Sequence, residues 1–271
     1  MPFVVRSWNV FHGRTDPPGH DDHLEEAVRL ASGDRPAVLC LQEVPVWGLA
    51  RLAEWSGMTA LGDVARPASI GPLPIPAELG RRLTGLASPI ARSAFSGQGN
   101  AILLDPGLRT LRRRRIVLND RRFRRAQSPR LELDLLTRLA WAKERRVCQA
   151  ARIALPDGRT ALVANLHATS LASCRRVTDA ELVRAACFAD ALAEPGDVLV
   201  LAGDFNATPE RSRALADLAG PVWGFSAPGP GIDHVLVRGA DVPQLRVWPE
   251  ERRRIDGRLL SDHPPVELTI S

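Results

Sequence analysis

Asp204 and Asn206 stand two positions apart at the end of an aliphatic run, in the segment LAGDFNATP (residues 201–209). If Val198 to Ala202 form a strand, its two-residue period sends Asp204 and Asn206 to the same side, where they would act on one target. The same segment also fits an ordinary turn, because Gly, Asp and Asn favour loops and Thr208-Pro209 can open a helix. This segment alone leaves both interpretations open.

Other aliphatic runs carry a polar residue of the same kind at one end. These residues are Asn9 (after VVRSW), Glu43 (after AVLCLQ), His167 (after ALVANL), Asp233 (before HVLV), and Asp262 with His263 (before PPVELTI). Carboxylate, amide and imidazole groups can bind a cation or hold a phosphate. Their repetition at strand ends favours one shared site over a set of unrelated turns.

In this order and at these separations, the motifs SWN, LQE, GDFN and SDH resemble those of the endonuclease/exonuclease/phosphatase superfamily. That family includes deoxyribonucleases, abasic-site endonucleases, inositol polyphosphate phosphatases and bacterial sphingomyelinases. The resemblance implies an α/β fold, a four-layer α/β/β/α sandwich of two mixed β-sheets flanked by helices, with the site at one edge of the sheets. It also implies hydrolysis of a phosphate ester with a divalent cation, Mg²⁺ or Mn²⁺.

The resemblance also implies a role for each residue. The expected metal ligands are Glu43, Asn9 and Asp262, and the expected catalytic residues are His263, Asp204, Asn206, Asp233 and His167. In this scheme Asp233 fixes the His263 imidazole, Asp204 and Asn206 orient or deprotonate the attacking water, and His167 with Asn206 holds phosphate oxygens. A cation offsets the negative charge that repels hydroxide from a phosphodiester. Whether Asp204 or His263 takes the proton, and whether one or two metals bind, stays open.

The amino-acid composition is basic, with 36 lysine and arginine residues against 31 aspartate and glutamate residues. The 271 residues carry a formal charge of +5 and a pI near 9.8, which permits attraction to phosphate-bearing partners. Lys143 is the one lysine among 36 basic residues and tyrosine is absent, so any single arginine cluster carries less weight. Nine arginines lie between Arg109 and Arg125. They fit either a nucleic-acid contact strip or a solvated strand edge.

Several function classes are disfavoured. Without tyrosine, the tyrosine that abasic-site endonucleases use near the phosphate is missing, and His167 holds that place, as in the deoxyribonuclease and phosphatase branches. The four cysteines are widely spaced, so neither a zinc ribbon nor a disulfide framework is indicated. No leader and no apolar run of roughly 20 residues is present, and we expect a cytoplasmic monomer without a membrane span.

We therefore expect a metal-dependent phosphodiesterase of the nuclease type. One alternative is a phosphatase that acts on a small-molecule or inositol-type phosphate. A further alternative is a non-catalytic, arginine-rich nucleic-acid-binding protein on the same scaffold. Because a decayed enzyme would be expected to lose part of the polar set, its completeness favours catalysis.

Three other polar positions have two interpretations each. Asn100 either structures the edge of the site or belongs to an ordinary turn. His234 is expected to be packed away from the site, because successive residues in a strand point to opposite faces and its neighbour Asp233 is the site candidate. His12, His20 and His23 lie near several aspartates, and their irregular spacing favours a solvated surface over a second metal site, although His12 is close enough to Asn9 to line the cleft.

Hydrophobic periodicity indicates the elements that must position these residues. We expect strands at 3–10, 36–44, 100–104, 114–118, 146–155, 160–168, 198–202, 231–239, 244–248 and 265–270. Helices are expected at 21–32, at 47–57, from about residue 77, at 178–196 with a Thr178–Glu181 capping box, and at 210–220. Hairpins mixed with helical crossovers predict mixed sheets with helices on their outer faces, in a single domain over residues 1–271.

Overall fold

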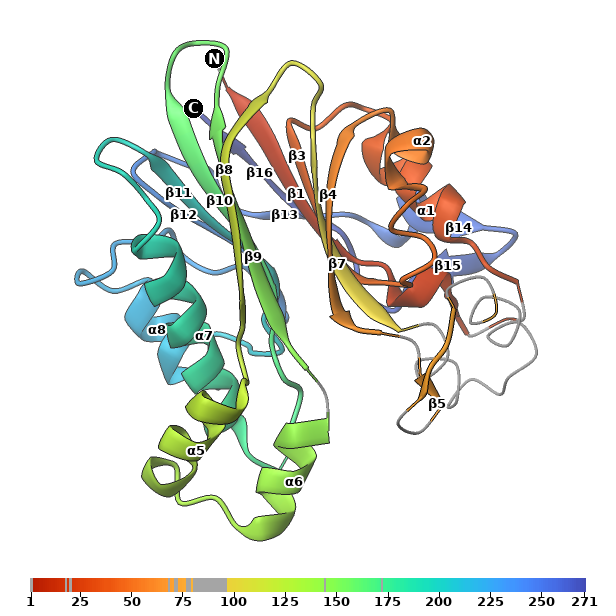
Figure 1. The fold of residues 1–271 in the computed structure, drawn as a ribbon. Helices are drawn as coiled ribbons and strands as arrows, with labels where there is room; N and C mark the ends of the chain where they lie inside the picture. The colour runs from red at the N-terminus through yellow and green to blue at the C-terminus, as the bar shows by residue number, and fades with distance from the viewer. Residues whose placement is uncertain are drawn as a thin grey trace.

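In the computed structural model, two β-sheets pack face to face and helices cover the outer side of each (Figure 1). The structure describes residues 2–17, 19, 21–67, 69–70, 73–76, 79, 97–143, 145–171 and 173–271. The α/β/β/α sandwich expected from the sequence is confirmed.

The first sheet places the polar ends of two parallel strands at one edge. Its order is β13-β16-β1-β3-β7-β4. The strands are β1 (Phe3–Asn9), β3 (Val38–Val44), β4 (Thr59–Arg66), β7 (Gln98–Leu104), β13 (Arg246–Val247) and β16 (Val266–Ile270). Asn9 pairs in register with Gln42, so Asn9 and Glu43 reach the same edge.

The second sheet brings three more polar residues to that edge. Its order is β12-β11-β10-β9-β8. The strands are β8 (Arg109–Val117), β9 (Val147–Ala154), β10 (Thr160–His167), β11 (Val198–Asp204) and β12 (Asp233–Arg238). Asp204 ends β11. On the parallel neighbour β10, His167 is in register with Asp204, and on the antiparallel neighbour β12, Asp233 lies opposite it.

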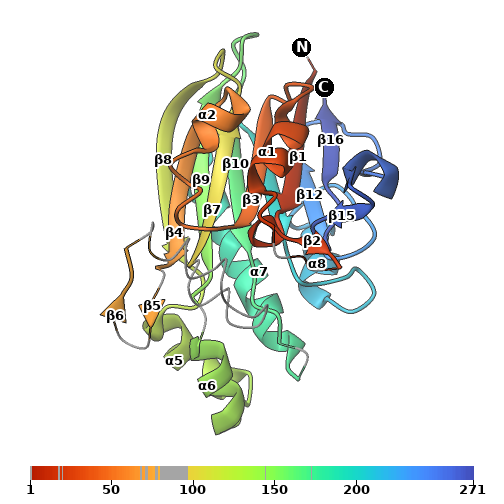
Figure 2. The same cartoon turned by 90° about the vertical axis from the view of Figure 1, so that its right-hand side faces the viewer.

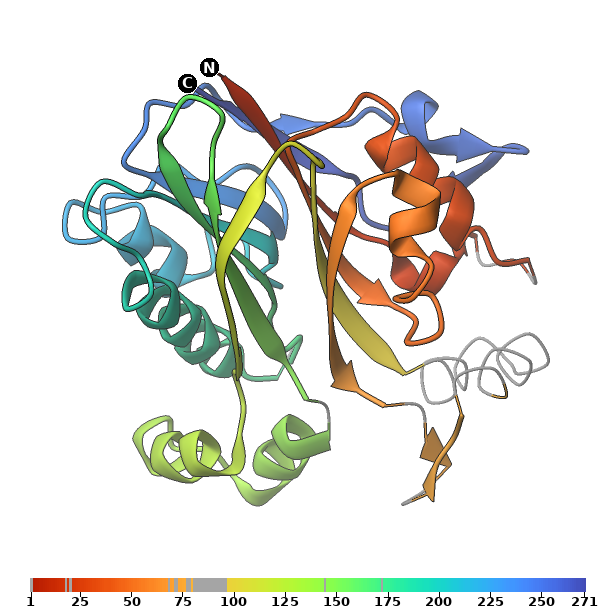
Figure 3. The same cartoon turned by 45° about the horizontal axis from the view of Figure 1, so that its top comes forward.

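Helices pack on the outer face of each sheet (Figure 3). On the first sheet lie α1 (Leu24–Ser32) and α2 (Leu52–Ser56), and on the second lie α7 (Arg175–Asp190) and α8 (Arg213–Leu218). Between β8 and β9 the chain forms α5 (Arg121–Arg130) and α6 (Leu135–Lys143), which extend beyond the lower end of the second sheet (Figures 1 and 2). No helix among the described residues combines the length and apolarity that crossing a bilayer requires.

The remaining elements are short. They are the turns of 3₁₀-helix η1 (Phe11–Gly13) and η2 (Glu250–Arg253) and the strands β2 (Thr15–Asp16), β5 (Ser69–Ile70), β6 (Leu73–Pro74), β14 (Arg254–Ile255) and β15 (Arg258–Leu260). β2 pairs with β15 in a three-stranded sheet with β14.

A buried polar bridge joins the two sheets next to the edge that carries the polar residues. Gln42 Nε2 donates to Asn165 Oδ1 at 2.8 Å, and Asn165 Nδ2 donates to the carbonyls of Leu41 and Ala101. Aliphatic side chains such as Val5, Val163 and Val200 fill the rest of the interface. Because the bridge is buried, sliding one sheet over the other would leave amide groups without partners, so the two edges stay aligned.

Three sequence predictions differ from the structure. Residues 121–125, part of the arginine strip for which a solvated strand edge was one interpretation, lie in helix α5, which Asp120 caps by accepting from Phe123 N at 2.9 Å. The helix expected from Thr178 begins at Arg175, and Glu181 bonds Thr169 instead of closing a capping box. The helix expected at 47–57 is shortened to α2. The helix expected from about residue 77 lies outside the described residues.

Candidate active site

The eight residues named from the sequence form one cluster at the shared edge of the sheets. All contacts in the cluster are 4.0 Å or less. Asp204 contacts His167, Asn9, Asn206 and His263. His167 also contacts Glu43, and His263 also contacts Asp233 and Asp262. The cluster draws on β1, β3, β10, β11, β12 and the loop before β16. Residues up to 254 positions apart in sequence thus share one site.

Asp204 lies at the centre and is buried. Its Oδ1 accepts from Asn206 N at 2.9 Å, and its Oδ2 accepts from Asn9 Nδ2 at 3.0 Å. Burial and the nearby charge of Asp233 raise the pKa of Asp204 to about 7, against the opposing effects of His263 and Asn9. A carboxylate with such a pKa can take up a proton near neutral pH.

His263 is held in one orientation by Asp233. His263 Nδ1 lies 2.7 Å from Asp233 Oδ2, and Trp8 Nε1 donates to the His263 carbonyl at 2.8 Å. This leaves Nε2 facing Asp204 at 4.0 Å. Burial lowers the pKa of His263, but the hydrogen bond and charge of Asp233 outweigh burial and raise it to about 10. A protonated imidazole that faces the centre of the cluster can stabilise negative charge there.

His167 has the opposite character. Burial and the charge of Arg146 hold the pKa of His167 well below its ordinary value. Arg146 Nη1 lies 2.7 Å from His167 Nε2, and Asn119 Oδ1 accepts from Arg146 N at 3.0 Å. Arg146 was missed in the sequence, where its one signal was its place directly before a strand, and arginine is too common in this chain for that to stand out.

Glu43 remains ionised against His12. His12 Nε2 lies 3.1 Å from Glu43 Oε2. Burial raises the pKa of Glu43, but the neighbouring His12 imidazole outweighs burial and leaves it well below its usual range. Glu43 and His12 both have φ near +55°, a conformation that non-glycine residues rarely adopt and that concentrates at functional sites. His12, a secondary candidate in the sequence, therefore lies directly at the site.

Oxygen donors suited to a hard cation are present in this cluster. The ionised Glu43 side chain is 19% exposed and the Asp262 side chain 44% exposed, so both can reach a solvated ion. Burial, and to a smaller extent the charge of Glu43, raises the pKa of Asp262, and a cation bound near both carboxylates would relieve that repulsion. The Asn9 amide oxygen accepts from Phe11 N and lies between β1 and η1. These donors fit the chemistry of Mg²⁺ or Mn²⁺.

A second group of ligand atoms, from Asp204, Asp233 and His263, lies within 4.8 Å of one another. One of its three ligand atoms comes from the His263 imidazole, whereas a hard cation prefers oxygen donors. The oxygen donors around Glu43 therefore suit a cation better than this triad.

Asn206, His234 and Asn100 each make a hydrogen bond to a backbone carbonyl. Asn206 has φ +49° and donates from Nδ2 to the Ala168 carbonyl at 3.0 Å, so this N–H fixes a loop. His234 is buried, packs edge-on against Phe205 and contacts the Ala207 carbonyl at 2.9 Å, which confirms the packed interpretation. Asn100 is buried and donates weakly to the Val147 carbonyl.

The possible second histidine site is not assembled among the described residues. His12 turns to Glu43, whereas His23 lies 3.9 Å from the helical Glu26. His20 lies outside the described residues.

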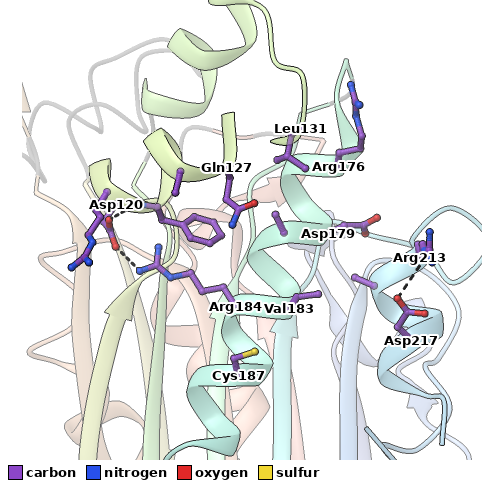
Figure 4. Close-up of a pocket in the computed structure, with 15 residues that line it drawn as sticks. Asp120, Gln127, Leu131, Arg176, Asp179, Val183, Arg184, Cys187, Arg213 and Asp217 are labelled. Carbon is purple, nitrogen blue, oxygen red and sulfur yellow. Dashed lines mark hydrogen bonds and ion pairs between the residues drawn. The ribbon is translucent and has the colours of Figure 1, made fainter. Parts of the chain in front are cut away.

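A hollow of about 830 Å³ between α5, α7 and α8 is separate from this cluster (Figure 4). Its charged groups pair with one another, as Arg184 does with Asp120 and Arg213 with Asp217. The Arg184 guanidinium also stacks over Phe123, with its carbon 4.2 Å from the ring centroid. None of the lining residues belongs to the eight.

Comparison with known proteins places this geometry in context. A family model described as the Endonuclease/Exonuclease/phosphatase family matches residues 7–263. A search of curated proteins found no match.

Solved structures share the fold. A Bacteroides thetaiotaomicron protein of the endonuclease/exonuclease/phosphatase family matches with a TM-score of 0.66 and 15% identity over 100% of this chain and 95% of that one. The human Nocturnin catalytic domain with bound sulfate anion matches with a TM-score of 0.66 and 17% identity over 100% and 93% of the two chains. Humanized D. rerio TDP2 matches with a TM-score of 0.62 and 15% identity over 100% and 99%.

Proposed function

The chain belongs to the endonuclease/exonuclease/phosphatase family, and on this premise we propose that it is a divalent-metal-dependent hydrolase that cleaves a phosphodiester by in-line attack of water. The observation that carries the proposal is the buried Asp204 carboxylate, with its pKa near 7, between the His167 and His263 imidazoles. Strongly perturbed carboxylate pKa values concentrate at functional sites.

Glu43, Asp262 and Asn9 would hold the cation, either Mg²⁺ or Mn²⁺. Bound there, the cation would offset the negative charge that develops on the phosphate oxygens. The Arg146 guanidinium lies against His167, which also contacts Glu43, and it adds positive charge to the same edge. A phosphate at this edge would therefore face positive charge from the protein as well as from the metal.

Asp204 is the proton acceptor in this proposal. Its pKa is matched to a task at neutral pH, whereas the pKa of His263, raised to about 10, keeps the imidazole protonated. The protonated Nε2 of His263 would stabilise the phosphate oxygens, and Asp233 would hold the ring in place. Asn206 supports this arrangement through its backbone N–H, which donates to Asp204, and through its side chain, which fixes the loop after His167.

Both sheets supply essential parts of this site, and we treat residues 1–271 as one catalytic domain. Asn9 and Glu43 come from the first sheet, and His167, Asp204 and Asp233 come from the second. Neither sheet alone would retain the cluster.

The test is a panel of phosphate esters assayed with Mg²⁺, with Mn²⁺ and with a chelator. It contains single- and double-stranded DNA, RNA, an abasic-site duplex, bis-(p-nitrophenyl) phosphate, a phosphomonoester and an inositol phosphate. We expect metal-dependent hydrolysis of the diesters, and a faster reaction of the monoester or the inositol phosphate would transfer the assignment to a phosphatase. Metal-independent activity, or no hydrolysis of any phosphate ester, would overturn the proposal.

A further inference from the structure

Helices α5 and α6 border a hollow in which four of the six lining residues are arginine. It has a volume of about 330 Å³, and its lining residues are Arg121, Arg124, Arg125, Ser128, Pro129 and Arg138. Residues 121, 124, 125 and 128 have the spacing of one helix face, so α5 presents three guanidinium groups on one side. Arg138 adds a fourth from α6. We refer to this feature as the α5–α6 arginine pocket.

Within the described part of the chain, the four arginines of the α5–α6 arginine pocket form no ion pair, although the charge of Asp134 acts on Arg138. No carboxylate described here lies within 4.0 Å of any of its four guanidinium groups. Arg124 Nε donates to the Asn119 carbonyl and Arg138 Nε to the Leu133 carbonyl, each at 2.9 Å. These bonds orient the two side chains while leaving their terminal nitrogens available. Four like charges around one hollow favour an anion with several oxygen acceptors.

Arginines of the neighbouring strand behave differently. Arg113 donates to Asp63 at 2.7 Å and Arg115 donates weakly to the Val64 carbonyl, so these two tie β8 to β4 across the sandwich. The arginine strip seen in the sequence is thus two features, a structural link on β8 and an unpaired cluster on α5. Nucleic-acid contact, one of the two interpretations of the strip, concerns the second feature.

The α5–α6 arginine pocket is fixed to the catalytic edge on both of its sides. Asn119, whose carbonyl accepts from Arg124, also holds Arg146, and Arg146 contacts His167. Trp141 of α6 donates to Glu181 at 2.6 Å, and Glu181 accepts from Thr169 N, two residues after His167. Figures 1 and 2 show α5 and α6 beyond the lower ends of β8 and β9, at the end of the sheet where β10 and β11 also finish. An anion in the pocket and a phosphate at the site could therefore belong to one molecule.

We infer that the α5–α6 arginine pocket binds a non-scissile phosphate of a polynucleotide strand whose scissile phosphate lies at Asp204 and His167. The inference rests on the proposed function and specifies its substrate class. Phosphates recur at every nucleotide of a strand, and a guanidinium group can bind two oxygens of one phosphate. A substrate with a single phosphate would fill the catalytic site and leave the α5–α6 arginine pocket empty.

The experiment compares the double variant Arg121→Gln/Arg125→Gln with the control Arg109→Gln/Arg112→Gln. Both remove two exposed arginines without a described carboxylate partner, but the control lies on β8, outside the pocket. Glutamine keeps the helix propensity of arginine close to unchanged. Each protein is assayed with Mn²⁺ on a single-stranded DNA 20-mer, on an inositol polyphosphate and on bis-(p-nitrophenyl) phosphate, at several salt concentrations.

We expect kcat/KM for the 20-mer to fall about tenfold or more in the pocket variant, and its dependence on salt to weaken by about one unit of log–log slope for each arginine lost. Hydrolysis of bis-(p-nitrophenyl) phosphate should stay unchanged in both variants, and the control should keep wild-type activity on the 20-mer. The variant Arg121→Lys/Arg125→Lys should recover part of the loss, because lysine restores charge without bidentate binding.

Three results would overturn the inference. They are an unchanged kcat/KM for the 20-mer in the pocket variant, an equal loss in the control, and a loss confined to the inositol polyphosphate. A wild-type protein that hydrolyses none of the three substrates would instead overturn the proposed function, which keeps the two failures distinct.

Discussion

The substitution Asp204→Asn separates the proposed catalytic role of this residue from its structural role. Asp204 Oδ1 accepts from Asn206 N and Oδ2 accepts from Asn9 Nδ2. An amide of the same shape has one acceptor oxygen. Whichever way it is turned, its NH₂ group faces an N–H donor, and one of the two buried hydrogen bonds is lost.

Two effects of opposite sign decide the stability of this variant. Losing one partner of a buried hydrogen bond costs about 1–3 kcal/mol. Against this, the variant removes a carboxylate whose pKa burial and Asp233 raise to about 7. When folding raises the pKa of an acid, the free energy of unfolding decreases as pH rises from the unfolded-state pKa through the folded-state pKa. Above pH 7 the ionised Asp204 therefore destabilises the folded protein, whereas a neutral amide does not. We therefore expect the free energy of unfolding at pH 7.5 to change by less than about 2 kcal/mol.

Activity should respond far more strongly. Without the proton acceptor, kcat is expected to fall by about 10²–10⁴, which corresponds to about 3–5 kcal/mol in the activation barrier. The assay is hydrolysis of bis-(p-nitrophenyl) phosphate with saturating Mn²⁺, run beside urea unfolding at the same pH. Asp241→Asn, on an exposed loop, is the matched control and should match wild type in both measurements.

The reasoning is refuted if Asp204→Asn keeps kcat within about tenfold of wild type. It is also refuted if this variant unfolds while Asp241→Asn does not, since the hydrogen-bond argument would then have underestimated the structural role of the carboxylate.

The remaining predictions concern the imidazole, the cation and an acid-sensitive ion pair. His263→Ala should lose about 10²-fold or more in kcat while the protein remains folded, and near-native turnover would contradict this. Glu43→Gln should need at least about tenfold more Mg²⁺ or Mn²⁺ for half-maximal activity, measured by titration into chelator-treated protein, and an unchanged requirement would remove Glu43 from the metal site. Asp34→Asn should lower the free energy of unfolding by less than about 1 kcal/mol above pH 4, since the Asp34 side chain is 47% exposed. Hydrogen bonding to Arg6 lowers the pKa of Asp34 to about 2, so this difference should vanish as pH falls from 4 to 2 in urea titrations, and a constant difference would rule the pair out.

Strand ends were the most predictable part of this protein. A period of two, an aliphatic run and a terminal polar residue are local properties, so Asn9, Glu43, His167 and Asp204 could be named from the sequence together with the strands that carry them. The family resemblance then supplied the order and the layers of the sandwich, which the structure confirms.

The α5–α6 region was not predictable in the same way. Arginine and leucine favour helices, but the arginine bias of the chain masked this signal and the cap at Asp120. Trp141 and Glu181 stabilise this region through a bond that spans 40 positions, and no local pattern encodes such a contact.

The sequence by itself determined which groups stand at the catalytic edge, because strand alternation and strand direction act over a few residues. Only the tertiary structure decided their chemical states, since a pKa depends on burial and on charges brought together from distant segments. Such contacts raise the pKa of Asp204 to about 7 and that of His263 to about 10, and they lower the pKa of His167 beside Arg146. The separation of the arginine strip into a structural link and an open pocket has the same origin, because Asp63 and α6 reach β8 and α5 only in the folded chain.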